Sequence, residues 1–398
     1  MSYYFPSPPT SPTERKRKRS ISNVDTQQQQ KQVKLDPTLL ERYLITGGSP
    51  NIRDTQRGFS LLCWACYSKS ESALELLLRQ EDLDPTTTHG PDRSTALHIA
   101  ASVGFSNGIE TLLLHIRRHN PSLEQQCLNA LDQQGATPLH VAVLANQPQC
   151  VEILLKQGKA KINIQDRQGR LPLHIAFLYR RMACAQLLLD ALQQEEDMDL
   201  LWIPNHVDHR NVIEECIVGG CVTLLKGLIM KINQQQQQQS KKKNKRNINK
   251  NNLIRLAVFW NRIECLELLL GATTESWNQD DNDDVGTQQM KPETDPMHHH
   301  DHTPLYQAVQ QRKLDLVQCL REKANANPCL PNGHNPSLIY AASHGFLDMI
   351  PLLLTQDTSS DCIRQAVLLA EPLGLSNTIV HIIKTLRHQQ QQHGSSSY

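Results

Sequence analysis

The feature that most constrains this chain is an internal repeat, seen clearly in the segment GATPLHVAVLANQPQCVEILLKQG at residues 135–158. When the chain is aligned with itself on the threonine of this segment, similar segments begin 29 to 51 residues apart. The nine starting positions are Ser60, Thr95, Thr137, Leu171, Asn211, Asn252, Thr303, Pro336 and Gln365. Such a period predicts stacked units, each of which needs its neighbours in order to bury its apolar face.

Two positions of the repeat predict its local structure. The sixth position is alanine in eight copies and cysteine in one, and so small a residue lets neighbouring helices approach closely. Its members are Ala65, Ala100, Ala142, Ala176, Cys216, Ala257, Ala308, Ala341 and Ala370. The tenth position holds glycine or asparagine in six copies, namely Gly104, Asn146, Gly220, Asn261, Gly345 and Gly374. Because these residues tolerate a left-handed backbone, we expect a helix, a left-handed turn and a second, antiparallel helix in each unit.

The best-preserved copies read TALHIAA, TPLHVAV, LPLHIAF and TPLYQAV, and they resemble the ankyrin repeat with its T-P-L-H-x-A signature. The resemblance covers roughly residues 36–388. It implies an all-α solenoid of about nine helix-turn-helix units, with short β-hairpin-like fingers and a concave face that binds other proteins. It also implies that His98, His140 and His174 bond to neighbouring backbone. The units beginning at Asn211, Asn252 and Gln365 lack the TPLH residues.

The pattern divides the chain into an array and its flanks. Residues 1–35 are predicted to be a disordered, basic, Ser/Pro-rich tail, and 36–59 an N-terminal capping helix and turn. The array spans 60–388, with low-complexity inserts at 233–250 and 273–301, and a second disordered tail covers 389–398. Since no apolar run reaches the ~18 residues of a membrane span, we expect a soluble intracellular protein. Its eleven cysteines are expected to be free thiols, because several of them share one apolar helix position.

The two inserts differ in charge. Residues 240–250 contain six basic residues and no acid, whereas residues 275–301 contain eight acids and a single lysine. Two interpretations stay open: the acidic insert shields the basic one until a partner displaces it, or the two are independently solvated loops. Glutamine tracts at 27–30, 234–239 and 389–392 are compatible with weak association.

The N-terminal tail carries a basic cluster and two sites of possible modification. Arg15, Lys16, Arg17, Lys18 and Arg19 are consecutive. Such a cluster is typical of a nuclear import signal, and the alternatives are a nucleic-acid contact or a plain solvated tail. The import interpretation places the protein in the nucleus, with shuttling to the cytoplasm as an option. Ser7 and Ser11 each precede a proline and resemble sites of proline-directed kinases, whose phosphates would add negative charge beside the cluster.

No motif in the sequence predicts an enzyme. The CWAC segment at 63–66 has the spacing of a redox pair, but it fills helix positions of the first full repeat, which favours a structural role. The MHHHDHT segment at 297–303 contains zinc-ligand residue types, yet neighbouring residues in one loop rarely converge on one ion. We therefore predict no cofactor, no metal and no catalytic residue.

The eighth and ninth positions of the repeat are the candidate binding surface. They end the first helix, on the face that the ankyrin family leaves open. The residues we select there are Tyr67, Leu178, Tyr179, Phe259 and Trp260. Exposed aromatic side chains concentrate binding energy, although inserted fingers folded over these rings would make them part of the core instead.

These features predict a non-enzymatic interaction scaffold, nuclear and regulatory, that binds another protein on its concave face. The competing hypothesis is a regulatory factor that contacts DNA or RNA through the basic segments 15–19 and 241–250. A steep salt dependence would distinguish nucleic-acid binding from protein binding. Neither the identity of the partner nor the oligomeric state follows from the sequence.

Overall fold

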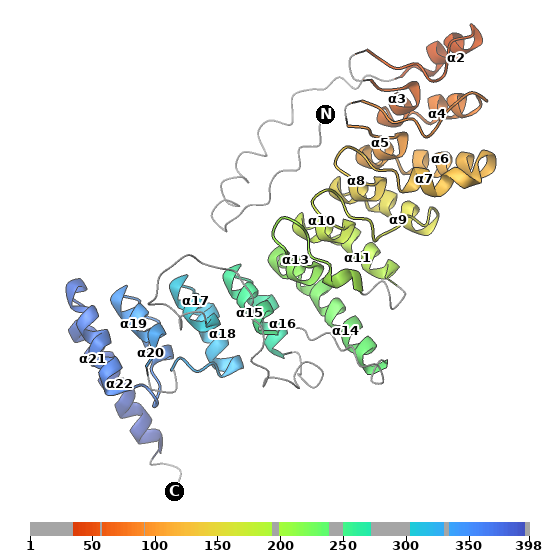
Figure 1. Cartoon of the computed structure of the whole chain (residues 1–398). Helices are drawn as coiled ribbons and strands as arrows, with labels where there is room; N and C mark the ends of the chain where they lie inside the picture. Colours follow the sequence, from red (N-terminus) through yellow and green to blue (C-terminus); the bar gives the residue numbers. More distant parts are fainter. Residues whose placement is uncertain are drawn as a thin grey trace. The chain divides into compact units, whose positions relative to one another are not determined.

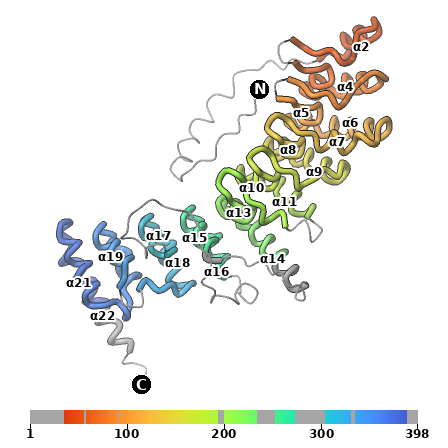
Figure 2. The backbone as a smooth tube through the Cα atoms, in the orientation of Figure 1, coloured from red at the N-terminus to blue at the C-terminus, as the bar shows by residue number. Residues whose placement is uncertain are grey.

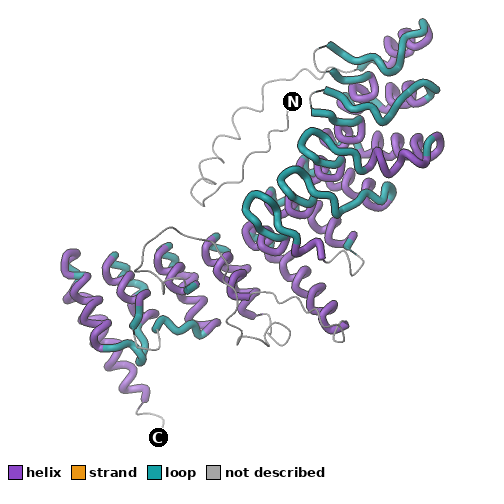
Figure 3. Tube along the Cα trace, in the orientation of Figure 1, coloured by secondary structure: helices purple, strands orange, loops and turns teal. Residues whose placement is uncertain are grey.

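The structure is a computed structural model that describes residues 35–55, 58–90, 92–192, 199–238, 250–271, 303–329 and 334–394. The chain forms two compact units, Met1–Leu228 and Ile229–Tyr398. Each unit is built from antiparallel helix pairs joined by tight turns (Figure 1). The secondary structure of the described residues is helix and loop (Figure 3).

In the first unit, α2 (Pro37–Ile45) precedes the complete helix pairs. The pairs are α3 (Leu61–Tyr67) with α4 (Glu71–Leu78), α5 (Ala96–Val103) with α6 (Ser106–His119), α8 (Pro138–Leu144) with α9 (Pro148–Lys156), α10 (Pro172–Leu178) with α11 (Met182–Ala191), and α13 (Val212–Gly219) with α14 (Val222–Gln238). Short helices η1 (Pro121–Leu123) and α7 (Glu124–Leu128) follow α6, and η2 (Asp199–Trp202) precedes α13.

The second unit continues the same pattern, and the division between the units falls within α14. Its pairs are α15 (Lys250–Phe259) with α16 (Ile263–Gly271), α17 (Pro304–Gln310) with α18 (Leu314–Ala324), α19 (Pro336–Ser343) with α20 (Ile350–Leu353), and α21 (Ser360–Leu369) with α22 (Ser376–Gly394). A short helix, η3 (Glu371–Leu373), lies between α21 and α22.

Helices of the same kind stack on one another within each unit. In the first unit the first helices α3, α5, α8, α10 and α13 form one row, and the second helices α2, α4, α6, α9 and α11 form another (Figure 2). The second unit has the rows α15, α17, α19, α21 and α16, α18, α20, α22. The core therefore runs between two layers of helices, as expected for a solenoid.

The small sixth position makes this stacking possible. All nine of its residues, from Ala65 to Ala370, are 0% exposed. Since a side chain of this size takes little room, the first helices of neighbouring pairs pack closely. The eleven cysteines are free, and all except Cys329 are buried.

The tenth position is left-handed in every copy. The six predicted glycines and asparagines have φ between 54° and 74°, which confirms the expected turn. The other three copies hold Lys69, Arg180 and Arg312, with φ of 52°, 56° and 53°. The turn is thus a constant of the repeat, even where the residue is one that rarely adopts this conformation.

The structure differs from the prediction at the start of the last copy. Its first helix begins at Ser360, not after Gln365, because the Ser359 side chain accepts a hydrogen bond from Cys362 N and caps the helix there. Ala370 is nevertheless fully buried and Gly374 is left-handed, so the predicted sixth and tenth positions hold although the helix begins six residues earlier. In addition, α14 extends to Gln238 and α22 to Gly394, into segments that the sequence pattern assigned to an insert and a tail. Glutamine is a good helix former, which explains these extensions.

The β-hairpin-like fingers are not confirmed. In the described part of the chain, the loops between successive helix pairs contain only isolated β-bridges, Arg53 with Ser60 and His89 with Ser94. Backbone hydrogen bonds close the later turns, as from Asp132 N to Ala136 O and from Gly135 N to Asp132 O, each at 3.0 Å. The repeat number of nine stays a prediction.

A substitution at the sixth position tests the packing. We expect Ala142→Leu to lower the free energy of unfolding by about 2 kcal/mol, because the added atoms have no room between the first helices. Gln149→Leu, at an exposed position of the same helix pair, should change it by less than about 0.5 kcal/mol. Urea unfolding followed by circular dichroism measures both. Equal effects of the two substitutions would contradict the close packing.

Candidate functional site

The turns between first and second helices carry an unbalanced set of charges. We call positions nine to eleven of the repeat the helix-turn ridge. It comprises residues 68–70, 103–105, 145–147, 179–181 and 219–221 in the first unit, and 260–262, 311–313, 344–346 and 373–375 in the second. Its charged residues are Lys69, Arg180, Arg181, Arg262, Arg312 and Lys313, with no aspartate or glutamate. Since the whole chain has 41 basic and 40 acidic residues, this bias does not follow from composition.

Direct contacts join the ridge from pair to pair in the second unit. Gln311 Nε2 donates a hydrogen bond to the backbone O of Phe259, the residue just before the ridge in the neighbouring pair, at 3.2 Å. The neighbouring Arg312 places its guanidinium carbon 5.1 Å from the centre of the Phe346 ring. Leu373, next along, lies beside Gly345 and is 49% exposed. Within the second unit the ridge therefore forms a continuous surface with apolar and cationic groups side by side.

An aromatic stack supports this surface. The ring centre of Tyr340 lies 4.0 Å from that of His344 in a stacked arrangement and 5.6 Å from that of Tyr306. Tyr306 is buried, whereas His344 is exposed. The Phe346 ring lies at the edge of the stack, with its centre 6.3 Å from that of Tyr340. Side chains held in this way lose less conformational entropy when they form a contact.

Three ridge cations occupy a costly backbone conformation. A left-handed lysine or arginine costs about 1 kcal/mol relative to the right-handed form. The negative end of the first helix favours a cation at its C-terminus, which offsets part of this cost. Lys69, Arg180 and Arg312 are exposed, so their side chains are presented to solvent.

The predicted binding residues differ in how far their side chains are exposed to solvent. Phe259 is 42% exposed, as expected of a contact residue. Tyr67, Leu178 and Tyr179 are half-buried, and burial raises the pKa of the Tyr179 phenol. The prediction that Trp260 is exposed is wrong: it is 5% exposed and its ring packs edge-on against Phe259, with centroids 5.7 Å apart. Adjacent residues at the end of a helix point in different directions, and the larger ring turns inward.

Several predicted sites lie outside the described residues. They are Ser7, Ser11, the cluster Arg15–Arg19, the basic segment 241–249 and the histidines at 298–300 and 302. Among the residues that the structure does describe, no three His, Cys, Asp or Glu side chains are grouped to hold a metal ion.

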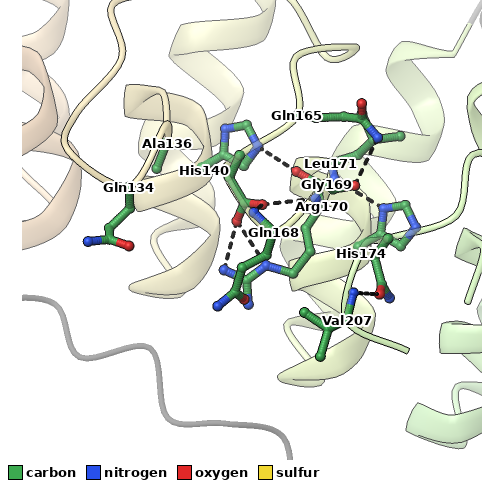
Figure 4. Close-up of polar contacts among 12 residues, drawn as sticks. Gln134, Ala136, His140, Gln165, Gln168, Gly169, Arg170, Leu171, His174 and Val207 are labelled. Carbon is green, nitrogen blue, oxygen red and sulfur yellow. Dashed lines mark hydrogen bonds and ion pairs between the residues drawn. The ribbon is translucent and has the colours of Figure 1, made fainter. Parts of the chain in front are cut away.

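Histidines connect neighbouring pairs through the loops that precede the first helices of the first unit; we call the side of the array that carries these loops the finger side. His140 Nδ1 accepts a hydrogen bond from Thr137 N at 3.1 Å, and Nε2 donates to Arg170 O at 3.1 Å (Figure 4). His98 repeats the pattern, with Nε2 donating to Ala136 O at 3.0 Å. One imidazole thus caps its own helix and holds the backbone that precedes the next first helix.

A buried ion pair stabilises one of these turns. The side chains of Asp166 and Arg170 are 1% and 4% exposed. Asp166 Oδ2 accepts from Arg170 Nε at 2.8 Å and from Nη2 at 2.7 Å, while Oδ1 accepts from the backbone N of Gln168 and Arg170 (Figure 4). The carboxylate is therefore fully hydrogen-bonded, as a buried charge requires.

Adjacent turns are also joined through their backbones. Arg167 N donates to Gln134 O at 2.9 Å, and His206 N donates to Gln168 O at 2.7 Å. These bonds and the histidine bonds make the finger side a rigid support for the helices that carry the ridge.

A family model described as ankyrin repeats (3 copies) matches residues 33–124, 117–200 and 279–365, which is well over half of the chain. The chain belongs to the ankyrin-repeat family. The matched stretches leave out 201–278, where the units lack the TPLH residues. The ankyrin pattern of packing is nevertheless present there, since Cys216 and Ala257 are 0% exposed and Gly220 and Asn261 are left-handed.

A curated protein with a similar ankyrin segment is "Putative E3 ubiquitin-protein ligase XBAT31" of Arabidopsis thaliana. The two are 26% identical over 130 residues, which cover 32% of this chain and 27% of that protein. The chain therefore spans about a quarter of the length of this relative. In the part of the chain that the structure describes, no helix has the length and hydropathy needed to cross a bilayer.

The ankyrin histidines are held in the neutral form. Burial lowers the pKa of His98, His140 and His174 to about 4 in each case. Burial likewise raises the pKa of the Cys63 thiol to about 12 and that of Cys66 well above its usual value. Cys63 and Cys66 are free and buried within α3, and burial keeps both thiols in the protonated form.

The buried histidines predict an acid-sensitive fold. The usual histidine pKa is 6.5, so between pH 6.5 and pH 4 the unfolded chain binds protons that the folded chain does not. The free energy of unfolding should therefore decrease as the pH is lowered through this window, by up to about 1.4 kcal/mol per pH unit for each histidine. His140→Gln keeps a side-chain acceptor at the third helical position for the Thr137 cap, but glutamine does not titrate. The dependence of the free energy of unfolding on pH should therefore become shallower by the contribution of one proton.

The measurement is urea unfolding at several pH values from 4 to 7. His381→Gln, at an exposed position of α22, is the matched control and should leave the slope unchanged. If His140→Gln retained the wild-type slope, protonation of this buried histidine would not drive the loss of stability.

Proposed function

We propose that the chain is a non-enzymatic adaptor that holds a protein partner on the helix-turn ridge of its second unit. Membership of the ankyrin family supports an interaction scaffold as the general role. The observation that carries the specific proposal is the continuous surface formed by Gln311, Arg312 and Phe346 of the ridge with Phe259, the residue just before it, together with the complete absence of acids from the ridge.

The chemistry of this surface specifies the kind of partner. Arg312 and Lys313 favour carboxylates, while Phe259 and Leu373 offer apolar contact area. A protein segment that combines acidic with aromatic or aliphatic residues satisfies both. Arginine and aromatic residues are the side chains that most often dominate binding energy at protein interfaces.

The ridge fits a protein segment better than a nucleic acid. Nucleic-acid binding needs several phosphate contacts along a backbone, whereas the second unit offers three ridge cations interrupted by apolar groups. A nucleic acid remains the competing partner that the experiment below distinguishes by salt dependence.

The relative named as an E3 ligase supports one use of such an adaptor. In that context an ankyrin segment would hold a substrate for a modifying complex while the chemistry is performed elsewhere. We propose the same division of labour here, with the array as the substrate-holding part. The cluster Arg15–Arg19 supports a nuclear site of action, since consecutive basic residues are typical of import signals.

The ridge proposal is tested by partner capture with the full chain. Phe259→Ala combined with Arg312→Asn should reduce recovery of bound proteins in proximity labelling at least tenfold, because each change removes a contact worth about 1–2 kcal/mol. Asparagine is chosen at residue 312 because it retains the left-handed turn while removing the charge.

The matched control combines Leu131→Ala with Lys226→Asn. These residues are also an exposed apolar residue and an exposed cation, but they lie off the ridge. The control should capture the same proteins as the wild type. Undiminished capture by the ridge variant would place the binding surface elsewhere, and recovery of nucleic acid with a steep salt dependence would favour the competing function.

The nuclear proposal has its own test. Replacing Arg15, Lys16, Arg17, Lys18 and Arg19 with alanine in a fluorescently tagged full chain should lower the nuclear-to-cytoplasmic ratio severalfold. Lys241, Lys242, Lys243, Lys245 and Arg246 replaced together provide a control with the same loss of five charges. An unchanged ratio in the first variant would show that these five residues do not direct import.

A further inference from the structure

An apolar groove of about 470 Å³ lies at the N-terminal end of the array. It lies between α2 and α3, and the loop that joins them contributes Ile52. Its lining residues are Leu35, Asp36, Leu39, Leu40, Tyr43, Ile52, Leu61 and Trp64. Leu39 is 62% exposed and Ile52 is 49% exposed, so the groove presents large apolar side chains to solvent.

The groove occupies the place of a missing helix. Each interior first helix of this unit packs between two others, as α5 does between α3 and α8. On its N-terminal side α3 has no such neighbour among the described residues, and α2 packs on α4 as a second helix without a first helix of its own. The position that a preceding first helix would take is therefore bounded by α2, Ile52 and α3.

The chain itself carries a segment suited to this groove. The 34 residues before Leu35 are mostly polar, but residues 3–9 read YYFPSPP. Three consecutive aromatic residues supply large apolar area, and the prolines favour an extended polyproline conformation that docks against aromatic side chains such as Tyr43 and Trp64. We call residues 3–9 the aromatic segment.

The tether allows the two parts to meet. The aromatic segment ends 26 residues before Leu35, which itself lines the groove. A flexible chain of that length has a root-mean-square span of roughly 25–30 Å. At an effective concentration of about 1 mM, even a contact with a dissociation constant near 0.1 mM would be about 90% formed.

We propose that the aromatic segment, residues 3–9, docks intramolecularly in the α2–α3 groove and completes the end of the array. Phosphorylation of Ser7 releases it. A proline-directed kinase transfers the terminal phosphoryl group of a nucleoside triphosphate to Ser7 Oγ: the new O–P bond forms as the P–O bond to the nucleoside diphosphate breaks, the diphosphate leaves, and the hydroxyl proton passes to solvent. Asp36 lies in the groove wall, where its Oδ1 accepts from Thr38 N at 2.9 Å. A phosphate brought beside this carboxylate and into an apolar groove is disfavoured by repulsion and by desolvation.

The test is hydrogen–deuterium exchange of the full chain, followed on peptides that cover α2. Replacing Tyr3, Tyr4 and Phe5 together with serine should speed exchange there about tenfold, while peptides from α8 and α9 stay unchanged. These substitutions lie outside the helical array, so folding of the array is not at risk. A synthetic peptide of residues 1–12, added to the triple variant at about 1 mM, should restore slow exchange. The same peptide with phosphoserine at residue 7 should not.

A groove variant provides the matched control. Leu39→Arg places a charge in the groove at a residue that is already exposed, so the 1–12 peptide should fail to protect α2 in a chain that carries both this change and the triple serine change. Equal exchange in the wild type and the triple variant would overturn the proposal. So would protection that rises with protein concentration, since that would assign the groove to a second copy. Equal protection of the Leu39→Arg chain by the peptide would also overturn it, because the peptide would then bind elsewhere.

Discussion

Close contact between first helices is the constraint on which the rest of this structure depends. A pair of short helices has too little apolar surface to be stable alone, so each pair relies on its neighbours. The residue at the sixth position decides how near those neighbours come, and all nine copies are excluded from solvent. Once this spacing is set, the left-handed turns and the loops between pairs recur at the same places, and the ridge follows as a regular surface.

The polar groups of the finger side and those of the ridge have different roles in the array. On the finger side of the first unit, His98 and His140 join each helix cap to the next pair, and Asp166 and Arg170 form a satisfied buried ion pair. On the ridge, charges are exposed and the backbone accepts strain at Lys69, Arg180 and Arg312. Polar groups thus stabilise one end of the helices and remain available for contacts at the other.

The sequence predicted those parts of the fold that depend on local chemistry. Alanine at the sixth position and glycine or asparagine at the tenth each act within a few residues, so a single sequence is enough to recognise them. Trp260 was misplaced because its burial depends on the tilt of the helix end against its neighbours, which no local pattern encodes. The start of the last first helix was misplaced because the residues that match the pattern, Ala370 and Gly374, lie after Leu369, the last residue of α21, and do not specify where that helix begins. The cationic ridge was missed although its signal, the lack of any acid at positions nine to eleven, can be read from the aligned copies.

The place where extra residues enter the repeat has a consequence for how such a chain diversifies. The longer insertions follow the second helices: α6 leads into η1 and α7, and residues 193–198, 239–249 and 272–302 follow α11, α14 and α16. Because paired helices are antiparallel, the end of a second helix lies opposite the turn that forms the ridge. The length of these loops and the residues of the ridge can therefore change independently. Loops on one edge of the array can lengthen while the opposite edge keeps its spacing, so an insertion need not disturb an existing recognition surface.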